Sequence, residues 1–132
     1  MDEHLKGTIL LCEDDNVIRD LYRKILELNG YRVIEAVDGD DAVEKFLEHR
    51  EAIRLMVSDV MMPNKNGTQA YEEIQKNNGR IKVIFNSGFN TETNRRLQEE
   101  GFHYLQKPYA PQLLLQKIRE VMVEECDSGG IR

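Results

Sequence analysis

The sequence predicts an α/β domain, a doubly wound, five-stranded parallel sheet with helices on both faces. Five short apolar segments carry the β-branched residues that are typical of strands. Four of them are followed by a segment whose apolar residues recur at helical spacing. This alternation calls for parallel strands, because parallel strands need crossover connections and helices supply them. At 132 residues the chain is long enough for one such domain with its own core.

The predicted strands are short runs in which apolar residues dominate or alternate with polar ones. They are TILLC (8–12), YRVIEA (31–36), IRLMVS (53–58), KVIFN (82–86) and FHYLQ (102–106). Each run has the length of an ordinary strand in a globular protein.

Apolar residues at helical spacing predict four of the five helices. These patterns lie at residues 17–26, 42–47, 70–74 and about 111–125. A further helix, residues 91–100, offers only Leu97 for burial, so we expect it to be loosely attached. Glycines fall where helices should stop or turns should form, in Asn29-Gly30, Asp38-Gly39, Asn78-Gly79 and at Gly101.

Three regions are predicted along the chain. Residues 1–6 are an N-terminal extension, residues 7–124 the domain, and residues 125–132 a flexible tail or linker. The start of the chain lacks the apolar stretch of a signal peptide, and no apolar run approaches ~18 residues. Cys12 and Cys126 form neither a disulfide framework nor a zinc spacing. These features predict a cytoplasmic protein.

The formal net charge of −6 argues against direct binding to nucleic acid or to an anionic membrane, because both would be repelled by the surface as a whole.

Polar residues with chemical potential stand at the carboxyl ends of the predicted strands. Glu13, Asp14 and Asp15 follow the first strand. Asp59 ends the third, Ser87 follows the fourth and Lys107 follows the fifth. In parallel sheets these ends share one edge, where ligands bind. Singly, each residue has an ordinary reading, with Asp15 or Asn16 as a helix N-cap, Ser87 as a turn residue and Lys107 as an exposed lysine. Together they favour a site.

The chemistry that fits this set is phosphoryl transfer. Crowded carboxylates repel one another, and Mg²⁺, which prefers oxygen ligands, relieves that repulsion. Glu13, Asp14 and Asp59 can supply the oxygens. A lysine and a hydroxyl group, here Lys107 and Ser87, can share the charge of a phosphoryl group. Asp59, at a central strand end, is the candidate nucleophile.

Four motifs resemble one family. LLCEDD, SDVMMPNKNG, FNSG and LQKPY, spread over about residues 7 to 124, resemble the receiver domain of bacterial two-component response regulators of the chemotaxis-regulator type. The resemblance implies a flavodoxin-like (βα)5 fold with strand order 2-1-3-4-5. The C-terminal half looks especially similar to the receivers of hybrid histidine kinases.

The resemblance also implies roles for individual residues. Asp59 would accept a phosphoryl group from the phosphohistidine of a sensor histidine kinase or a phosphotransfer domain in a phosphorelay. Glu13, Asp14, Asp59 and the backbone carbonyl of Met61 would bind Mg²⁺. Lys107 would contact the phosphoryl group, and the peptide bond between Lys107 and the proline that follows would be cis. Ser87 and Tyr104 would form a switch pair that alters the surface made by the fourth helix, the fifth strand and the fifth helix.

Three positions depart from the commonest pattern of that family. Glu13 replaces the more usual aspartate, and its longer side chain would reach the metal either directly, at a different angle, or through water. Ser87 replaces a frequent threonine and keeps the hydroxyl group. Met61 and Phe89 are apolar where some members carry polar groups, and apolar side chains there should exclude the attacking water. We therefore expect slow self-dephosphorylation.

Three function classes compete on the sequence. The first is a signalling phosphoacceptor, which is no enzyme beyond its own phosphorylation and dephosphorylation. The second is a Mg²⁺-dependent phosphohydrolase with an aspartyl-phosphate intermediate. Such enzymes usually carry a second acid two residues after the nucleophile, where this chain has Met61. The third is a phosphorylation-independent binding module.

The pathway stays open. The chain is either a stand-alone regulator or a receiver from a larger protein, a monomer or a weak phosphorylation-dependent dimer, and its downstream target is not identified by the sequence.

Overall fold

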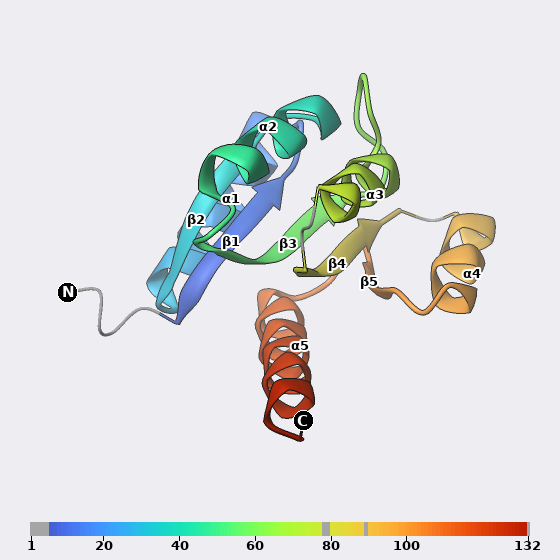
Figure 1. Ribbon diagram of the computed structural model, residues 1–132. Coiled ribbons are helices and arrows are strands. Elements are labelled where there is room, and N and C mark those ends of the chain that lie inside the picture. Colours follow the sequence, from blue (N-terminus) through green and yellow to red (C-terminus); the bar gives the residue numbers. More distant parts are fainter. Residues whose placement is uncertain (1–5, 78–79, 89, 132) are drawn as a thin grey trace.

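A single parallel sheet organises the computed structural model, which describes residues 6–77, 80–88 and 90–131. Its five strands run in the order β2-β1-β3-β4-β5, so the predicted α/β class and strand order are both confirmed (Figure 1). The elements are β1 (Gly7–Cys12), α1 (Asn16–Leu28), β2 (Tyr31–Ala36), α2 (Gly39–His49), β3 (Ile53–Asp59), α3 (Gly67–Lys76), β4 (Lys82–Ser87), α4 (Thr91–Glu99), β5 (His103–Gln106) and α5 (Pro111–Ile131).

Two apolar clusters cover the two faces of the sheet. One contains Phe46 of α2, Ile74 of α3 and Leu97 of α4. The other contains Leu26 of α1 and Ile118 of α5. Successive strand residues point to opposite faces, so each strand contributes apolar side chains to both clusters.

Capping side chains define where the helices begin. Asp15, Asp38, Asn66 and Asn90 each accept hydrogen bonds from backbone N–H groups in the first turn of α1, α2, α3 and α4. Of the two caps considered for the first helix, Asp15 is confirmed.

The last helix is longer than predicted. α5 continues past Glu125 to Ile131. The sequence places residues 125–132 in a flexible tail or linker, whereas the backbone of residues 125–131 is helical. A glycine inside a helix costs about 1 kcal/mol relative to alanine, which weakens the helix without necessarily ending it. Among the helices of the described residues, none combines the length and apolar character needed to cross a lipid bilayer.

Two glycines allow the backbone to close up around the carboxyl edge. A Cβ atom on Gly67 would lie 2.1 Å from the carbonyl oxygen of Asp59, and one on Gly39 would lie 1.9 Å from the carbonyl oxygen of Lys65. Gly39 therefore opens α2 with an approach that no side chain permits. Asn64 also joins the loop after β3 to the start of α2, because its amide donates a hydrogen bond to Asp38 Oδ2 at 2.7 Å.

Replacing Gly39 with alanine is expected to lower the free energy of unfolding by about 2–4 kcal/mol, because the added methyl group forces the loop after β3 away from α2. Urea unfolding of the purified variant measures this. The control is Gly101→Ala, where a Cβ meets no atom within 4 Å and only the positive φ of 82° opposes it. That variant should lose about 1 kcal/mol. Equal losses in the two variants would contradict the close-approach explanation.

Candidate functional site

Three carboxylates meet at the carboxyl edge of the sheet. Glu13 and Asp14 follow β1, and Asp59 ends the neighbouring strand β3. Each offers an oxygen that lies within 4.8 Å of those of the other two. Asp14 is exposed, whereas Glu13 and Asp59 are only 3% and 6% exposed. The structure therefore brings together the three acids that the sequence selects.

Glu13 is held in a setting that disfavours its charge. Burial and the proximity of Asp59 raise the pKa of Glu13 to about 7. One of its oxygens, Oε2, accepts a hydrogen bond from the backbone N–H of Asp15 at 3.0 Å. The other, Oε1, is buried and accepts no hydrogen bond.

Lys107 supplies the positive charge of the site. Its Nζ lies 2.7 Å from Asp59 Oδ1 and 3.6 Å from Glu13 Oε1. Burial alone would lower the pKa of Lys107, but the contact with Asp59 and the two negative charges outweigh it and raise that pKa. The bond from Lys107 to Pro108 is cis, as the resemblance implied. The backbone N–H of Lys107 donates to Ser87 O at 2.7 Å, which ties the ends of β4 and β5 together.

A cavity of about 230 Å³ opens beside Asp59. Its lining includes Met61, Ser87 and Lys107, together with residues of the loop after β4. Among the residues that the structure describes, the Ser87 hydroxyl makes a single long contact, 3.4 Å, with the carbonyl oxygen of Gly88. It is therefore available to turn toward a group that enters the cavity.

Met61 stands at the mouth of this cavity, with its side chain 77% exposed. The assignment of its carbonyl oxygen as a metal ligand stays a prediction. Phe89, the other apolar residue expected to exclude water, lies outside the described residues.

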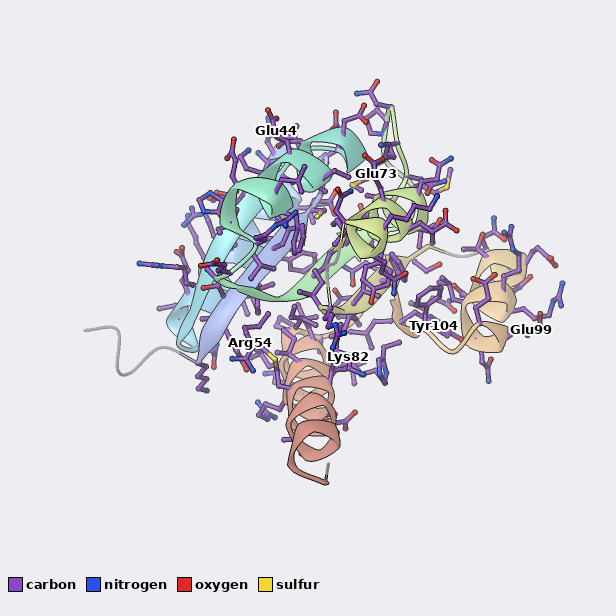
Figure 2. All side chains as sticks on the ribbon, viewed as in Figure 1. Glu44, Arg54, Glu73, Lys82, Glu99 and Tyr104 are labelled. Carbon is purple, nitrogen blue, oxygen red and sulfur yellow. The ribbon has the colours of Figure 1, made fainter. Side chains whose placement is uncertain are left out.

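Tyr104 lies on β5, on the side of the sheet covered by α4 (Figure 2). It is half-buried and packs against the cluster that contains Phe85. Next to it, Asn94 of α4 donates to Gln106 Oε1 at 3.0 Å. The Asn94 side chain is buried, and its Oδ1 accepts no hydrogen bond. The sequence reading named Leu97 as the one buried residue of α4 and missed Asn94.

Arg19 supports the loop that carries the acidic pair, a role the sequence reading also missed. Its Nη1 donates to the carbonyl oxygen of Glu13 at 2.8 Å, and its Nε donates to Glu35 Oε1 on β2 at 3.1 Å. Arg19 thereby links the backbone at Glu13, directly after β1, to Glu35 on the neighbouring strand β2. The sequence does not indicate which residues an arginine on a predicted helix will contact, because Glu35 becomes its neighbour only in the tertiary structure.

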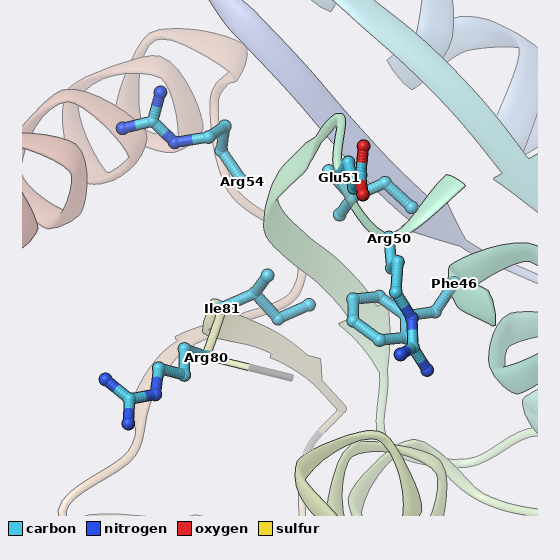
Figure 3. A pocket seen from close by; sticks show the side chains of 7 residues that line it. Phe46, Arg50, Glu51, Arg54, Arg80 and Ile81 are labelled. Carbon is cyan, nitrogen blue, oxygen red and sulfur yellow. The ribbon is translucent and has the colours of Figure 1, made fainter. Parts of the chain in front are cut away.

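A second hollow lies at the opposite, amino edge of the sheet (Figure 3). It has a volume of about 280 Å³ and is lined by apolar residues, three arginines and Glu51. The side chains of Arg50, Arg54 and Arg80 point in different directions in Figure 3, so they do not converge on one ligand.

The residues present fit a hard divalent cation. Three carboxylates at one point carry an excess of negative charge, and buried oxygens of Glu13 and Asp59 accept no aligned hydrogen bond. Oxygen donors of this kind are those that Mg²⁺ prefers. The acidic cluster can therefore hold a metal ion.

Comparison with known proteins yields a consistent group. A family model described as the response regulator receiver domain matches residues 9–119. An uncharacterized transcriptional regulatory protein, YbdJ of Bacillus subtilis, is 38% identical over 121 residues, which is 89% of this chain and 52% of that protein. The sensor kinase CckA of Brucella abortus is 32% identical over 121 residues, 90% of this chain and 13% of that kinase. The chain thus spans about half the length of the transcriptional regulator and a small part of the kinase.

Solved structures agree with the fold. A response regulator receiver domain protein from Clostridium thermocellum superposes with a TM-score of 0.82 at 27% identity, covering 90% of this chain and 96% of that one. The receiver domain of the hybrid histidine kinase CckA superposes with a TM-score of 0.73 at 29% identity, covering 86% and 97%.

Proposed function

Because the chain belongs to the response regulator receiver domain family of two-component signalling, we propose that Asp59 accepts a phosphoryl group from a phosphohistidine. The observation that carries this proposal is the convergence, beside one cavity, of a buried carboxylate, an acidic pair and a lysine. The match to a signalling family does not favour the phosphohydrolase, which would require repeated turnover of a phosphate ester.

The proposed reaction forms one bond and breaks one. An oxygen of the Asp59 carboxylate attacks phosphorus, the bond from phosphorus to the donor imidazole nitrogen breaks, and an acyl phosphate results. The leaving imidazole departs neutral if its other nitrogen carries a proton. Lys107, already 2.7 Å from Asp59, stabilises the negative charge on the transferred group.

Glu13, Asp14 and Asp59 would hold Mg²⁺, together with the backbone carbonyl of Met61. When bound, the ion would neutralise the excess negative charge and polarise the phosphoryl oxygens. Burial and the neighbouring Asp59 raise the pKa of Glu13, and a cation bound between the two carboxylates would offset both effects. Arg19 would keep the loop that carries Glu13 in place through its bond to the Glu13 carbonyl.

Phosphorylation would act on α4 and β5 through the added charge of about −1.5 to −2. The Ser87 hydroxyl would turn to the phosphoryl group, and Tyr104 would move into the space beside it. Few buried residues hold α4, namely Asn94 and Leu97, so a small free energy can shift it. Signal output through the α4-β5-α5 surface is part of this proposal.

Receiver domains of response regulators interact with histidine kinases. We place a sensor kinase or a phosphotransfer domain in that role here and propose that the chain catalyses only its own phosphorylation and dephosphorylation. The exposed Met61 at the cavity mouth and the exposed Val17 in the first turn of α1 offer apolar contacts to a donor. We further place the exchange in the cytosol, where a reduced thiol such as Cys12 persists.

The test is phosphate uptake from acetyl phosphate in the presence of Mg²⁺. Intact-protein mass spectrometry should show one phosphoryl group per chain, and uptake should stop when a chelator removes the metal. Borohydride reduction of the acyl phosphate should convert residue 59 to homoserine, which peptide mapping detects. Repeated hydrolysis of p-nitrophenyl phosphate without a retained phosphoryl group would instead support the phosphohydrolase.

A further inference from the structure

Asn86 is a buried polar residue beside the phosphoacceptor. It pairs with Asp59 in the register of β3 and β4. Val57 and Ile84, two residues earlier in each strand, both belong to the cluster that faces α1 and α5. Because side chains alternate along a strand, Asp59 and Asn86 point to that same face. Asn86 is only 3% exposed, and burying an amide costs free energy unless its polar atoms form hydrogen bonds.

A tyrosine fixes the Asn86 amide. The hydroxyl of Tyr109 donates to Asn86 Oδ1 at 2.6 Å. The Tyr109 ring stacks on Tyr22 of α1, with centroids 6.1 Å apart and planes at 5°. Burial and the adjacent Tyr22 raise the pKa of Tyr109, so its hydroxyl keeps the proton that it donates. The oxygen of Asn86 is therefore engaged, and the orientation of the amide is set from outside the cavity.

The Nδ2 group is the part of the Asn86 amide that Tyr109 does not contact. Asn86 lines the same cavity as Asp59, Ser87 and Lys107. An amide whose oxygen is held by Tyr109 can present only N–H donors to that cavity. Such donors suit phosphoryl oxygens, which carry negative charge, and hydrogen bonds to charged groups are stronger than those between neutral groups.

We propose that Asn86 is a phosphoryl-binding residue, whose Nδ2 donates a hydrogen bond to the group on Asp59, and that Tyr109 positions it. This inference rests on the proposed function, because it assumes a phosphoryl group at Asp59. Asn86 would be a third hydrogen-bond donor to the phosphoryl group, besides Lys107 and Ser87. Because Asn86 and Ser87 are adjacent on β4, their side chains approach from opposite faces of the strand. Tyr109 couples this donor to α1 through Tyr22.

The first test compares the wild type with Asn86→Leu, which keeps the volume but removes the amide. The probes are Mg²⁺ alone and fluoroberyllate with Mg²⁺, a mimic of the phosphoryl group, each titrated by calorimetry. We expect the affinity for fluoroberyllate to fall roughly tenfold or more, while the affinity for Mg²⁺ alone stays within about twofold. Equal loss for both probes, or no loss for either, would overturn the proposal.

The second test removes only the positioning contact. Tyr109→Phe keeps the ring and its stack but leaves Asn86 Oδ1 without its donor, so fluoroberyllate affinity should fall by less than in Asn86→Leu. Tyr31→Phe is the matched control, because it removes a hydroxyl from another tyrosine of the same apolar cluster, on β2 and away from the cavity, and it should bind fluoroberyllate like the wild type. A loss in Tyr31→Phe as large as that in Tyr109→Phe would contradict the positioning role.

A spectroscopic readout covers the case in which Asn86→Leu folds poorly. The side-chain amide resonances of Asn86, assigned in ¹⁵N-labelled wild-type protein, should shift when fluoroberyllate binds and should shift less in Tyr109→Phe. An unchanged Asn86 amide in a protein that binds fluoroberyllate would overturn this inference alone. A wild-type protein that neither binds fluoroberyllate nor takes up phosphate at Asp59 would instead overturn the proposed function.

Discussion

The Asp59→Asn variant is expected to take up no phosphoryl group from acetyl phosphate, under conditions in which the wild type is modified once per chain. An amide has nearly the shape of a carboxylate but lacks its negative charge, so it cannot form the bond to phosphorus. Asp59 is buried, contacts Lys107 and lines the cavity, and no other carboxylate among the described residues has all three properties. Intact-protein mass spectrometry measures the loss directly.

The matched control is Asp15→Asn, the same chemical change two residues from Glu13. Asp15 caps α1 by accepting hydrogen bonds from Val17 and Ile18, and asparagine caps helices equally well. This variant should keep full uptake and stability. Phosphate uptake by Asp59→Asn at the wild-type rate would show that Asp59 is not the phosphoacceptor. Loss of uptake in both variants would show that the loop between β1 and α1 is sensitive to any loss of charge, so the result for Asp59→Asn would no longer identify the phosphoacceptor.

The fold was predictable because its signals are local. Apolar runs such as IRLMVS and the helical spacing after them are visible along the chain, and each site acid or base stands at the end of such a run. Asp59 and Lys107 could therefore be placed on one edge before their distance was known. The strand order needed a resemblance to a known family, since periodicity alone does not say which strands are neighbours.

The features that the sequence did not predict depend on pairings between distant segments. Asn86 stands at the end of the run KVIFN, but its importance follows from its register with Asp59 and its contact with Tyr109. Asn94 is polar and would be expected at the surface, yet packing against β5 buries it. Gly39 reads as a turn residue, whereas the structure gives it a close contact with Lys65. Each of these features depends on contacts between segments that are far apart in the sequence.

The stability of the metal-free domain should decrease as the pH rises from about 5 to about 8. Burial and Asp59 raise the pKa of Glu13 from 4.5 to about 7, so the folded state holds a proton that the unfolded chain has already lost. The proton stabilises the fold fully below the unfolded pKa of 4.5, and this stabilisation disappears as the pH passes the folded pKa of about 7. The change is on the order of 2–3 kcal/mol in the free energy of unfolding.

Glu13→Gln isolates this contribution, because a neutral amide of similar shape neither gains nor loses a proton. In the presence of a chelator, urea unfolding should show the variant to be more stable than the wild type at pH 8 by that amount, with a flatter profile between pH 5 and pH 8. Adding Mg²⁺ should stabilise the wild type more at pH 8 than at pH 5, because the ion binds the ionised cluster. The variant should gain less from the ion. Parallel pH profiles in the two proteins would mean that the negative charge of Glu13 is already compensated by Lys107, 3.6 Å away, and that the cluster does not require a cation.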